Sequence, residues 1–198
     1  MLFKKPLPGE EAQLKMAPAY RAKYSPSEIE KFNPKVAAVL ILFYKQNEEW
    51  HLVFTERMTY KGVHSGQISF PGGKQEIGED LKQTALRETF EEIGVSPDLV
   101  ELVGSLSHVY IPPSNFSVYP FVGIANSEIS FKKQDDEVNQ IMEIPLSFFF
   151  SSENVAPTKI KLSEDIEFSV PAYVYRKKPI WGATAIILSE LVAVLENQ

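Results

Sequence analysis

The chain contains no cysteine among its 198 residues. Disulfide bridges and thiolate metal sites are therefore excluded, and the composition is compatible with a reducing compartment. No apolar run reaches the roughly 18 residues that a membrane-spanning helix requires. The segment from Met1 to Pro6 also lacks the apolar core of a signal peptide. These absences predict a cytoplasmic protein with no membrane partner.

The sequence has no excess of positive charge either. Its 20 lysine and arginine residues are outnumbered by 26 aspartates and glutamates, which gives a formal net charge of −6. A general nucleic-acid binder normally carries a basic surface, so nucleic acid is not an expected partner. Binding of a polyanionic substrate would have to rely on local cationic side chains and on a metal ion.

What the chain does have is enough apolar material for one good core, since 44% of its residues are hydrophobic. Residues 1–33 are rich in proline, lysine, glutamate and alanine. We expect them to form a lead-in that packs on a single domain of residues 34–198. The hydrophobic patterns predict strands over 36–44, 50–56, 100–110, 117–124, 128–131, 159–162 and 167–175. They predict helices over 10–16, 27–32 with Ser27 as N-cap, 80–93 and 184–195.

The stretch GKQEIGEDLKQTALRETFEEIGV, residues 73–95, is the most informative part of the chain. Its helix is bounded by a capping box formed by Asp80 and Gln83 and by Gly94 at a left-handed C-terminal position. Three carboxylates spaced i, i+3 and i+4 share one face of that helix, namely Glu88, Glu91 and Glu92. Apolar side chains on the opposite face, Leu86, Phe90 and Ile93, are predicted to be buried. Clustered carboxylates repel one another, and Mg²⁺ or Mn²⁺, which prefers such oxygens, would relieve that repulsion.

These residues follow the pattern G-x₅-E-x₇-R-E-U-x-E-E-x-G-U, in which U is a bulky apolar residue, with Thr89 as the one departure. The chain thus resembles the Nudix hydrolases. The resemblance implies an α/β fold, an α/β/α sandwich with a mixed β-sheet. It also implies Mg²⁺- or Mn²⁺-dependent attack of water on a diphosphate that links a nucleoside to another group.

The resemblance also assigns roles to individual residues. Metal ligands are implied to be the three glutamates of the helix and the carbonyl of Gly73. Arg87 would pin the loop by pairing with Glu79 or a neighbouring glutamate. The general base is left open among Glu92, Glu91 and a distant glutamate such as Glu137.

A second resemblance covers residues 52–73, which are similar to a motif of the coenzyme A pyrophosphatase branch. The matching positions are Thr55, Arg57, Gly66, Phe70, Pro71, Gly72 and Gly73. Met58 and Gly62 depart from the motif, where a small residue and a second arginine are usual. Candidate substrate-binding residues in this segment are Arg57, Lys61, His64 and Gln67.

The sequence therefore predicts hydrolysis of coenzyme A or its thioesters to 3′,5′-ADP and 4′-phosphopantetheine or its acyl form. A Nudix hydrolase of ADP-ribose or of a damaged nucleotide is the alternative, favoured if Met58 and Gly62 reflect a remodelled pocket. A catalytically silent ligand sensor is disfavoured, because a mere binder has no need of mutually repelling carboxylates. Whether the chain forms a homodimer is left open.

Overall fold

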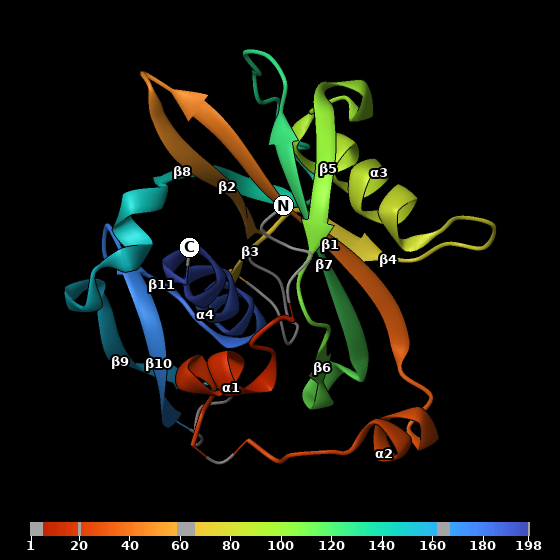
Figure 1. Cartoon of the computed structure of the whole chain (residues 1–198), viewed down its shortest axis with the longest axis vertical. Helices are drawn as coiled ribbons and strands as arrows, with labels where there is room; N and C mark the ends of the chain where they lie inside the picture. The colour runs from red at the N-terminus through yellow and green to blue at the C-terminus, as the bar shows by residue number, and fades with distance from the viewer. Residues whose placement is uncertain (1–5, 20, 59–65, 162–166, 198) are drawn as a thin grey trace.

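The computed structural model describes residues 6–19, 21–58, 66–161 and 167–197. Eight strands form a mixed sheet and three form a smaller one (Figure 1). The large sheet contains β1 (Lys35–Gln46), β2 (Glu49–Arg57), β3 (Ile68–Ser69), β4 (Gly72–Lys74), β5 (Val100–Ser105), β6 (Val109–Ile111), β7 (Phe116–Ala125) and β8 (Val138–Pro145). The smaller sheet contains β9 (Val155–Lys161), β10 (Glu167–Tyr175) and β11 (Lys178–Ile180). The α-helices are α1 (Glu10–Gln13), α2 (Pro26–Lys31), α3 (Leu81–Ile93) and α4 (Gly182–Glu196).

Strand β1 lies at the centre of the large sheet and explains its mixed character. It pairs antiparallel with β2 and β4 and parallel with β7. Its side chains alternate between two cores, with Ile41 and Phe43 on the face that α4 covers and Leu40 and Leu42 on the face that α3 covers. Burial on both faces is why this strand is a nearly continuous apolar run rather than an alternating one.

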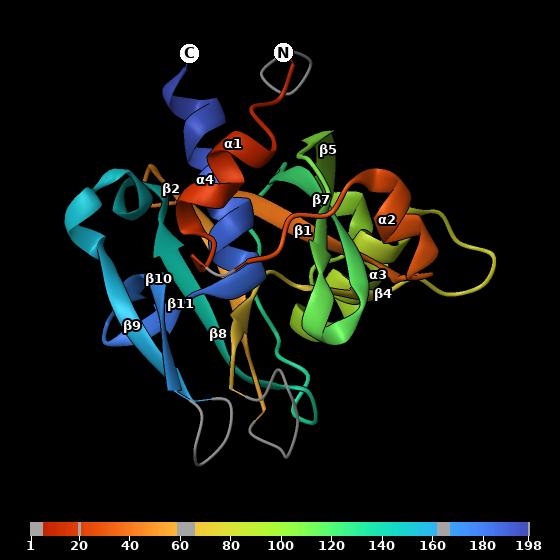
Figure 2. The same ribbon diagram turned by 90° about the horizontal axis from the view of Figure 1, so that it is seen from below.

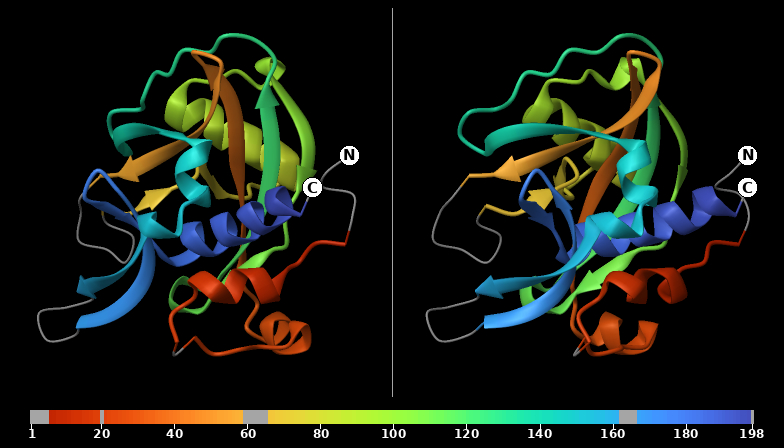
Figure 3. Two further views of the ribbon diagram at one scale, coloured as in Figure 1. Left: turned by 60° about the vertical axis from the view of Figure 1, so that its left-hand side comes forward. Right: turned by 90° about the vertical axis from the view of Figure 1, so that its left-hand side faces the viewer.

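Helices α3 and α4 lie on opposite faces of the large sheet, which confirms the predicted α/β/α sandwich (Figure 2). Helix α4 is enclosed between the large sheet and the smaller sheet of β9, β10 and β11 (Figure 3). Residues 184–191 of α4 are all buried. A helix that is covered on both sides needs apolar residues around most of its circumference, and this sequence supplies them.

Glu190 is a charged exception inside α4, and its side chain is fully buried. Its carboxylate accepts hydrogen bonds from Gly9 N at 3.1 Å, Gln13 Nε2 at 2.8 Å and Ser107 Oγ at 2.7 Å. Ser189 Oγ adds a bond of 2.7 Å to the carbonyl of Ala12. Glu190 therefore ties the segment around α1 to the loop after β5.

Replacing Glu190 by alanine is expected to lower the free energy of unfolding by about 2–5 kcal/mol, because the buried donors lose their common acceptor. Urea unfolding followed by tryptophan fluorescence measures the loss. Glu196→Ala, an exposed glutamate of the same helix, is the control and should change stability by less than about 0.5 kcal/mol. Equal effects of the two substitutions would contradict the structural role of Glu190.

Three predicted elements differ in detail. The N-cap of α2 lies two residues earlier than predicted, at Ser25 rather than Ser27, and Pro26 occupies the first turn. The predicted strand over 100–110 is split into β5 and β6. The predicted strand over 128–131 is wrong, since these residues form no strand.

The division of the chain into a lead-in of residues 1–33 and a domain of residues 34–198 stays a prediction. Within the described ranges, α1 packs on α4. None of the helices in the described part of the chain combines the length and the apolar content needed to cross a lipid bilayer.

Candidate active site

Helix α3 is bounded by local signals, as predicted. Asp80 Oδ1 accepts a bond from Gln83 N at 2.9 Å, and Asp80 N donates to Gln83 Oε1 at 2.7 Å, which completes the capping box. Gly94 follows the helix with φ of 74°, a left-handed conformation that glycine adopts without strain. These caps fix where the helix starts and ends, and hence the positions of its carboxylates along the helix axis.

The buried face of α3 is predicted correctly for Ile93, which is fully buried, and for Leu86, which packs partly buried against the core, but not for Phe90. Phe90 is 52% exposed, whereas Glu92 is 4% exposed. The buried positions of the helix are Thr84, Ala85, Thr89, Glu92 and Ile93. Small residues let α3 approach β1 and β4 closely, so the carboxylate side faces the sheet. Thr89, the departure from the apolar pattern, satisfies its hydroxyl by donating to Ala85 O at 2.7 Å.

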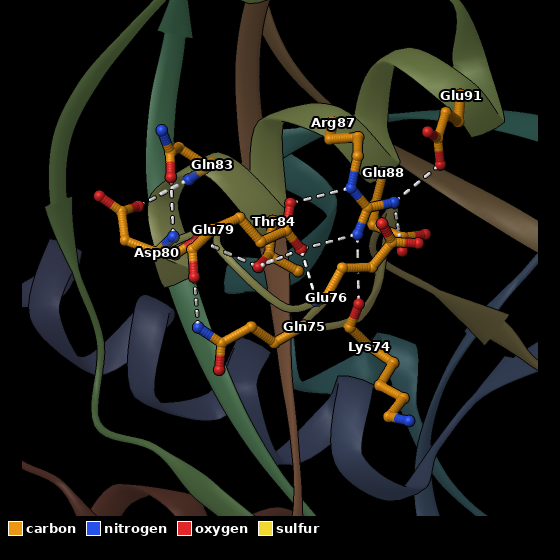
Figure 4. A network of polar contacts seen from close by, with 10 residues as sticks. All are labelled: Lys74, Gln75, Glu76, Glu79, Asp80, Gln83, Thr84, Arg87, Glu88 and Glu91. Carbon is orange, nitrogen blue, oxygen red and sulfur yellow. Dashed lines mark hydrogen bonds and ion pairs between the residues drawn. The ribbon is translucent and has the colours of Figure 1, made fainter.

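Arg87 is the centre of a polar network at the exposed edge of this face (Figure 4). Its Nε and Nη2 donate to the two carboxylate oxygens of Glu79 at 3.0 and 2.9 Å. Its Nη1 donates to Glu88 Oε1 at 2.8 Å and Glu91 Oε2 at 2.9 Å. Nη2 also donates to Lys74 O at 3.2 Å. One guanidinium thus joins the loop after β4 to two glutamates of α3.

Glu79 is held as a permanent anion by this network. Besides Arg87, its carboxylate accepts bonds from Glu76 N and Thr84 Oγ1, each at 2.8 Å. Hydrogen bonding from Arg87 is the largest factor that lowers the pKa of Glu79 to about 2. A group that stays ionised at every physiological pH is suited to positioning the loop rather than to exchanging protons.

Glu88 lies directly over the backbone of Gly73. A Cβ atom built on Gly73 would stand 2.3 Å from the carboxyl carbon of Glu88, so no larger residue fits there without moving this carboxylate. Burial is the main factor that raises the pKa of Glu88, and it outweighs the opposing effect of Arg87. The Gly73 backbone and the Glu88 oxygens are therefore neighbours, as a shared cation would require.

Glu92 is the most deeply buried of the three carboxylates. One oxygen accepts a bond from Gly72 N at 3.2 Å. Burial is the largest factor in the pKa of Glu92, which is raised to about 7; Arg57 lowers it, and Glu88 and Glu137 raise it further. A nearly enclosed carboxylate with one backbone donor and acidic neighbours is costly to ionise, which is the condition that a bound cation would relieve.

This pKa has a measurable consequence for the metal-free protein. The folded state holds the Glu92 proton up to about pH 7, whereas an exposed glutamate releases it near the ordinary value of 4.5. The loss of stability that comes from ionising the buried Glu92 carboxylate is absent below pH 4.5, grows as pH rises, and is complete above pH 7. It amounts to about 3 kcal/mol.

Urea unfolding in EDTA at pH 5, 6, 7 and 8 should therefore show the Glu92→Gln variant gaining stability relative to the unmodified protein as pH rises. The comparison cancels the contributions of titrating groups that do not interact with Glu92. A stability difference that stays constant over this range would contradict the raised pKa of Glu92.

A loop distant in sequence, residues 132–137, brings Glu137 close to Glu88 and Glu92. Lys132 N donates to Ile93 O at 2.9 Å and Gln134 N donates to Glu92 O at 3.0 Å, so residues 132–134 cap carbonyls at the end of α3. The Glu137 carbonyl in turn accepts a bond from Met58 N at 3.0 Å. Sequence reasoning named Glu137 only as one open candidate, because its approach to α3 depends on main-chain bonds that side-chain patterns do not reveal.

The predicted substrate residues are placed only in part. Arg57 lies at the end of β2, where it acts electrostatically on Glu92, and its N donates to Gln67 O at 3.0 Å. Arg57 and Gln67 are thus neighbours beside the carboxylates. Lys61 and His64 lie outside the described residues.

The carboxylate and carbonyl oxygens at this site are the ligand types that a hard divalent cation prefers. The described carboxylates are not already arranged around one point. Within the described residues, no three aspartate, glutamate, histidine or cysteine side chains form a ready metal cluster. Arg87 holds Glu88 and Glu91 in ion pairs. The oxygens suited to binding such a cation are those of Glu88 and Glu92. They lie beside the backbone of Gly72 and Gly73, which has no side chain in the way.

The chain is similar to known proteins in sequence and in fold. The model of the NUDIX domain matches residues 34–165. Nudix hydrolase 15, a mitochondrial protein of Arabidopsis thaliana, is 35% identical over 178 residues, which cover 83% of this chain and 60% of that protein. An uncharacterized Nudix hydrolase, NudL of Enterobacter sp. strain 638, is 33% identical over 164 residues, which cover 80% of this chain and 82% of that protein.

Nudix hydrolase 3 of Caenorhabditis elegans is 29% identical over 162 residues, and the match covers 73% of this chain and 66% of that protein. The chain therefore spans about 60% and 66% of the lengths of the plant and nematode relatives. Among solved structures, the Nudix hydrolase RenU of M. smegmatis matches with a TM-score of 0.58 and 13% identity, covering 83% of this chain and 87% of that one. This structural likeness concerns the fold alone.

Proposed function

The chain belongs to the Nudix hydrolase family, and from this premise we propose that it is a metal-dependent diphosphatase that cleaves coenzyme A or acyl-CoA. The products would be 3′,5′-ADP and 4′-phosphopantetheine or its acyl form. The observation that carries the proposal is the placement of Glu88 and Glu92 against the bare backbone of Gly72 and Gly73.

The proposed ligands of Mg²⁺ or Mn²⁺ are Glu88, Glu91, Glu92 and the carbonyl of Gly73. When bound, such an ion would neutralise diphosphate oxygens and activate a water molecule. Glu91 is the most exposed of the three glutamates, with 52% of its side chain accessible, and it can turn toward a ligand at little cost. Arg87 and Glu79 have a positioning role, because their bonds hold the loop after β4 against α3.

A general base must take a proton from the attacking water. Glu137 and Glu92 are the candidates that the geometry favours, since both lie near Glu88 and belong to one electrostatic cluster. Glu91 stays the third candidate. A base with a pKa near the working pH is the more effective one, and this favours Glu92 if it is not consumed as a ligand.

The substrate proposal rests on residues 52–73 rather than on α3. Arg57 and Gln67 are proposed to contact the substrate, together with Lys61 and His64 of the same segment. A guanidinium pairs well with a phosphate group, which the 3′-phosphate of coenzyme A offers. ADP-ribose or another nucleoside diphosphate derivative is the alternative, because Met58 and Gly62 depart from the coenzyme A motif.

A matched substrate panel tests the proposal. The protein with Mn²⁺ is given coenzyme A, acetyl-CoA, dephospho-coenzyme A, ADP-ribose and a nucleoside triphosphate in ¹⁸O water, and the products are identified by mass. Coenzyme A and acetyl-CoA should be cleaved at the diphosphate with the highest kcat/KM. Equal or faster cleavage of dephospho-coenzyme A would refute recognition of the 3′-phosphate, and faster cleavage of ADP-ribose would establish the alternative. Inactivity on the whole panel would favour a ligand sensor.

We also propose a cytoplasmic location. Absence of cysteine and the bacterial relatives favour the cytoplasm, whereas the names of two Arabidopsis relatives place those proteins in mitochondria and chloroplasts. A homodimer stays a prediction that size-exclusion chromatography with light scattering would decide.

A further inference from the structure

A cavity of about 360 Å³ lies between the N-terminal segment and β6. Lining residues between positions 9 and 29, in the segment from α1 to α2, supply one side, and lining residues between positions 107 and 112 supply the other. Ile186 of α4 also contributes to the lining. In the described part of the chain, no lining residue comes from α3, β2 or β4, so the cavity is distinct from the carboxylate cluster.

The cation of this cavity is Arg21, which is largely withdrawn from solvent. Its Nη2 donates to the Tyr110 carbonyl at 2.6 Å. Within the described residues, no carboxylate lies at ion-pair distance from Arg21, and the opposing influence of Glu10 does not prevent burial from lowering the pKa of Arg21. A guanidinium has five N–H donors, and a desolvated cation is normally paired with an anion. Glu10 lines the same cavity and influences Arg21 electrostatically, but it does not lie at ion-pair distance, so the guanidinium has no carboxylate partner among the described residues.

The rest of the lining suits an organic ligand rather than a bare ion. Lys23 adds a second cation, against one acid, Glu10, in a protein whose overall charge is −6. Tyr24 is held in place by an edge-on contact with Tyr110, with ring centroids 5.8 Å apart. Apolar surface comes from Leu14, Ile29, Val109 and Ile186. Charge at one side and apolar surface around it match the usual composition of small-molecule sites.

We propose that this cavity binds a small organic anion, a single carboxylate or phosphate group on an aromatic or apolar body. The oxyanion pairs with Arg21, and the body lies against Tyr24 and the apolar lining. Its volume falls at the lower end of the range for ligand sites, which suits a compact molecule. The inference is independent of the proposed function, because it uses no residue of the candidate active site.

Isothermal titration calorimetry with three probes tests this site: phenyl phosphate, benzoate and the neutral benzyl alcohol. The full-length protein in EDTA should bind one or both anions at one site and bind benzyl alcohol at least about tenfold more weakly. Arg21→Met should weaken the anions by at least about tenfold, since a charge-assisted hydrogen bond is lost. Arg176→Met, which removes an arginine from the turn between β10 and β11, is the matched control and should leave affinity unchanged.

A second variant protects the test against a folding artefact. Ala22→Phe enlarges an exposed lining residue while keeping Arg21, so it should narrow the cavity and weaken binding without lowering the melting temperature. Anion binding that is equally tight in the unmodified protein, Arg21→Met and Ala22→Phe would overturn the site. Failure of both anions to bind the unmodified protein would also overturn it.

Discussion

Substituting Glu92 by glutamine is expected to reduce kcat by roughly 10²–10⁴-fold, whatever the preferred diphosphate substrate. Glutamine keeps the shape and the acceptor oxygen that Gly72 N requires, but it removes the negative charge that a cation or a proton needs. The measurement is steady-state hydrolysis at saturating Mn²⁺, with the dissociation constant of Mn²⁺ determined in parallel.

The stability of the same variant separates chemistry from folding. Because Glu92 is buried beside Glu88 and Glu137, loss of its charge should make the metal-free protein more stable at pH 8, not less. Glu101→Gln, an exposed glutamate on β5, is the control and should leave kcat unchanged. A Glu92→Gln variant with near-normal turnover would refute the assignment of Glu92 to the active site.

The second large effect is expected at two adjacent glycines, where one added methyl group has different consequences. At Gly73, a Cβ atom would meet the carboxyl group of Glu88 at 2.3 Å. The end of a glutamate side chain can move away, so Gly73→Ala should keep the fold within about 1 kcal/mol. It should nevertheless lower kcat/KM by about 100-fold or more, because Glu88 leaves its place.

At Gly72 the methyl group would meet backbone instead. Its Cβ would stand 2.4 Å from the Ala38 carbonyl oxygen, and its φ of +151° is unfavourable for other residues. Moving the backbone of β1 away from the added methyl group is energetically costly. Gly72→Ala should therefore lower the free energy of unfolding by roughly 2–6 kcal/mol and the melting temperature by roughly 5–20 °C.

Gly78→Ala provides the comparison for both glycines. Its φ is +94°, but no atom lies within 4 Å of the added carbon, so only a modest loss of stability and full activity are expected. Thermal unfolding and kcat/KM for the three variants give the complete comparison. The interpretation fails if Gly73→Ala retains full activity, or if Gly72→Ala is as stable as Gly78→Ala.

Local features of the fold were predictable from sequence because their signals are local. Asp80, Gln83 and Gly94 determine the ends of α3 through bonds within one turn of the chain. The buried run of β1 could be identified from its apolar composition alone. The α/β/α architecture was accessible through family resemblance rather than through periodicity.

The burial of α3 was predicted correctly for Ile93 but wrongly for Phe90, and the cause of the error is tertiary. Hydrophobicity assigns Phe90 to the core, but the helix docks through Ala85 and Thr89, which allow closer contact with the sheet. This docking orientation buries Glu92, and the burial raises the pKa of Glu92. Sequence reasoning raised Glu137 as an open candidate but could not establish its proximity, because that depends on how residues 132–134 meet the end of α3.

Those contacts set rules for altering the loop. Both attachments to α3 use peptide nitrogens, of Lys132 and Gln134, so most side chains at these positions are interchangeable as far as the attachment is concerned. Proline would remove a donor, and a one-residue deletion would shift the spacing between the attachments and Glu137. Positions 132 and 134 can therefore be varied in composition, for example to change the charge around the candidate active site, provided that the length of the segment and its amide hydrogens are kept.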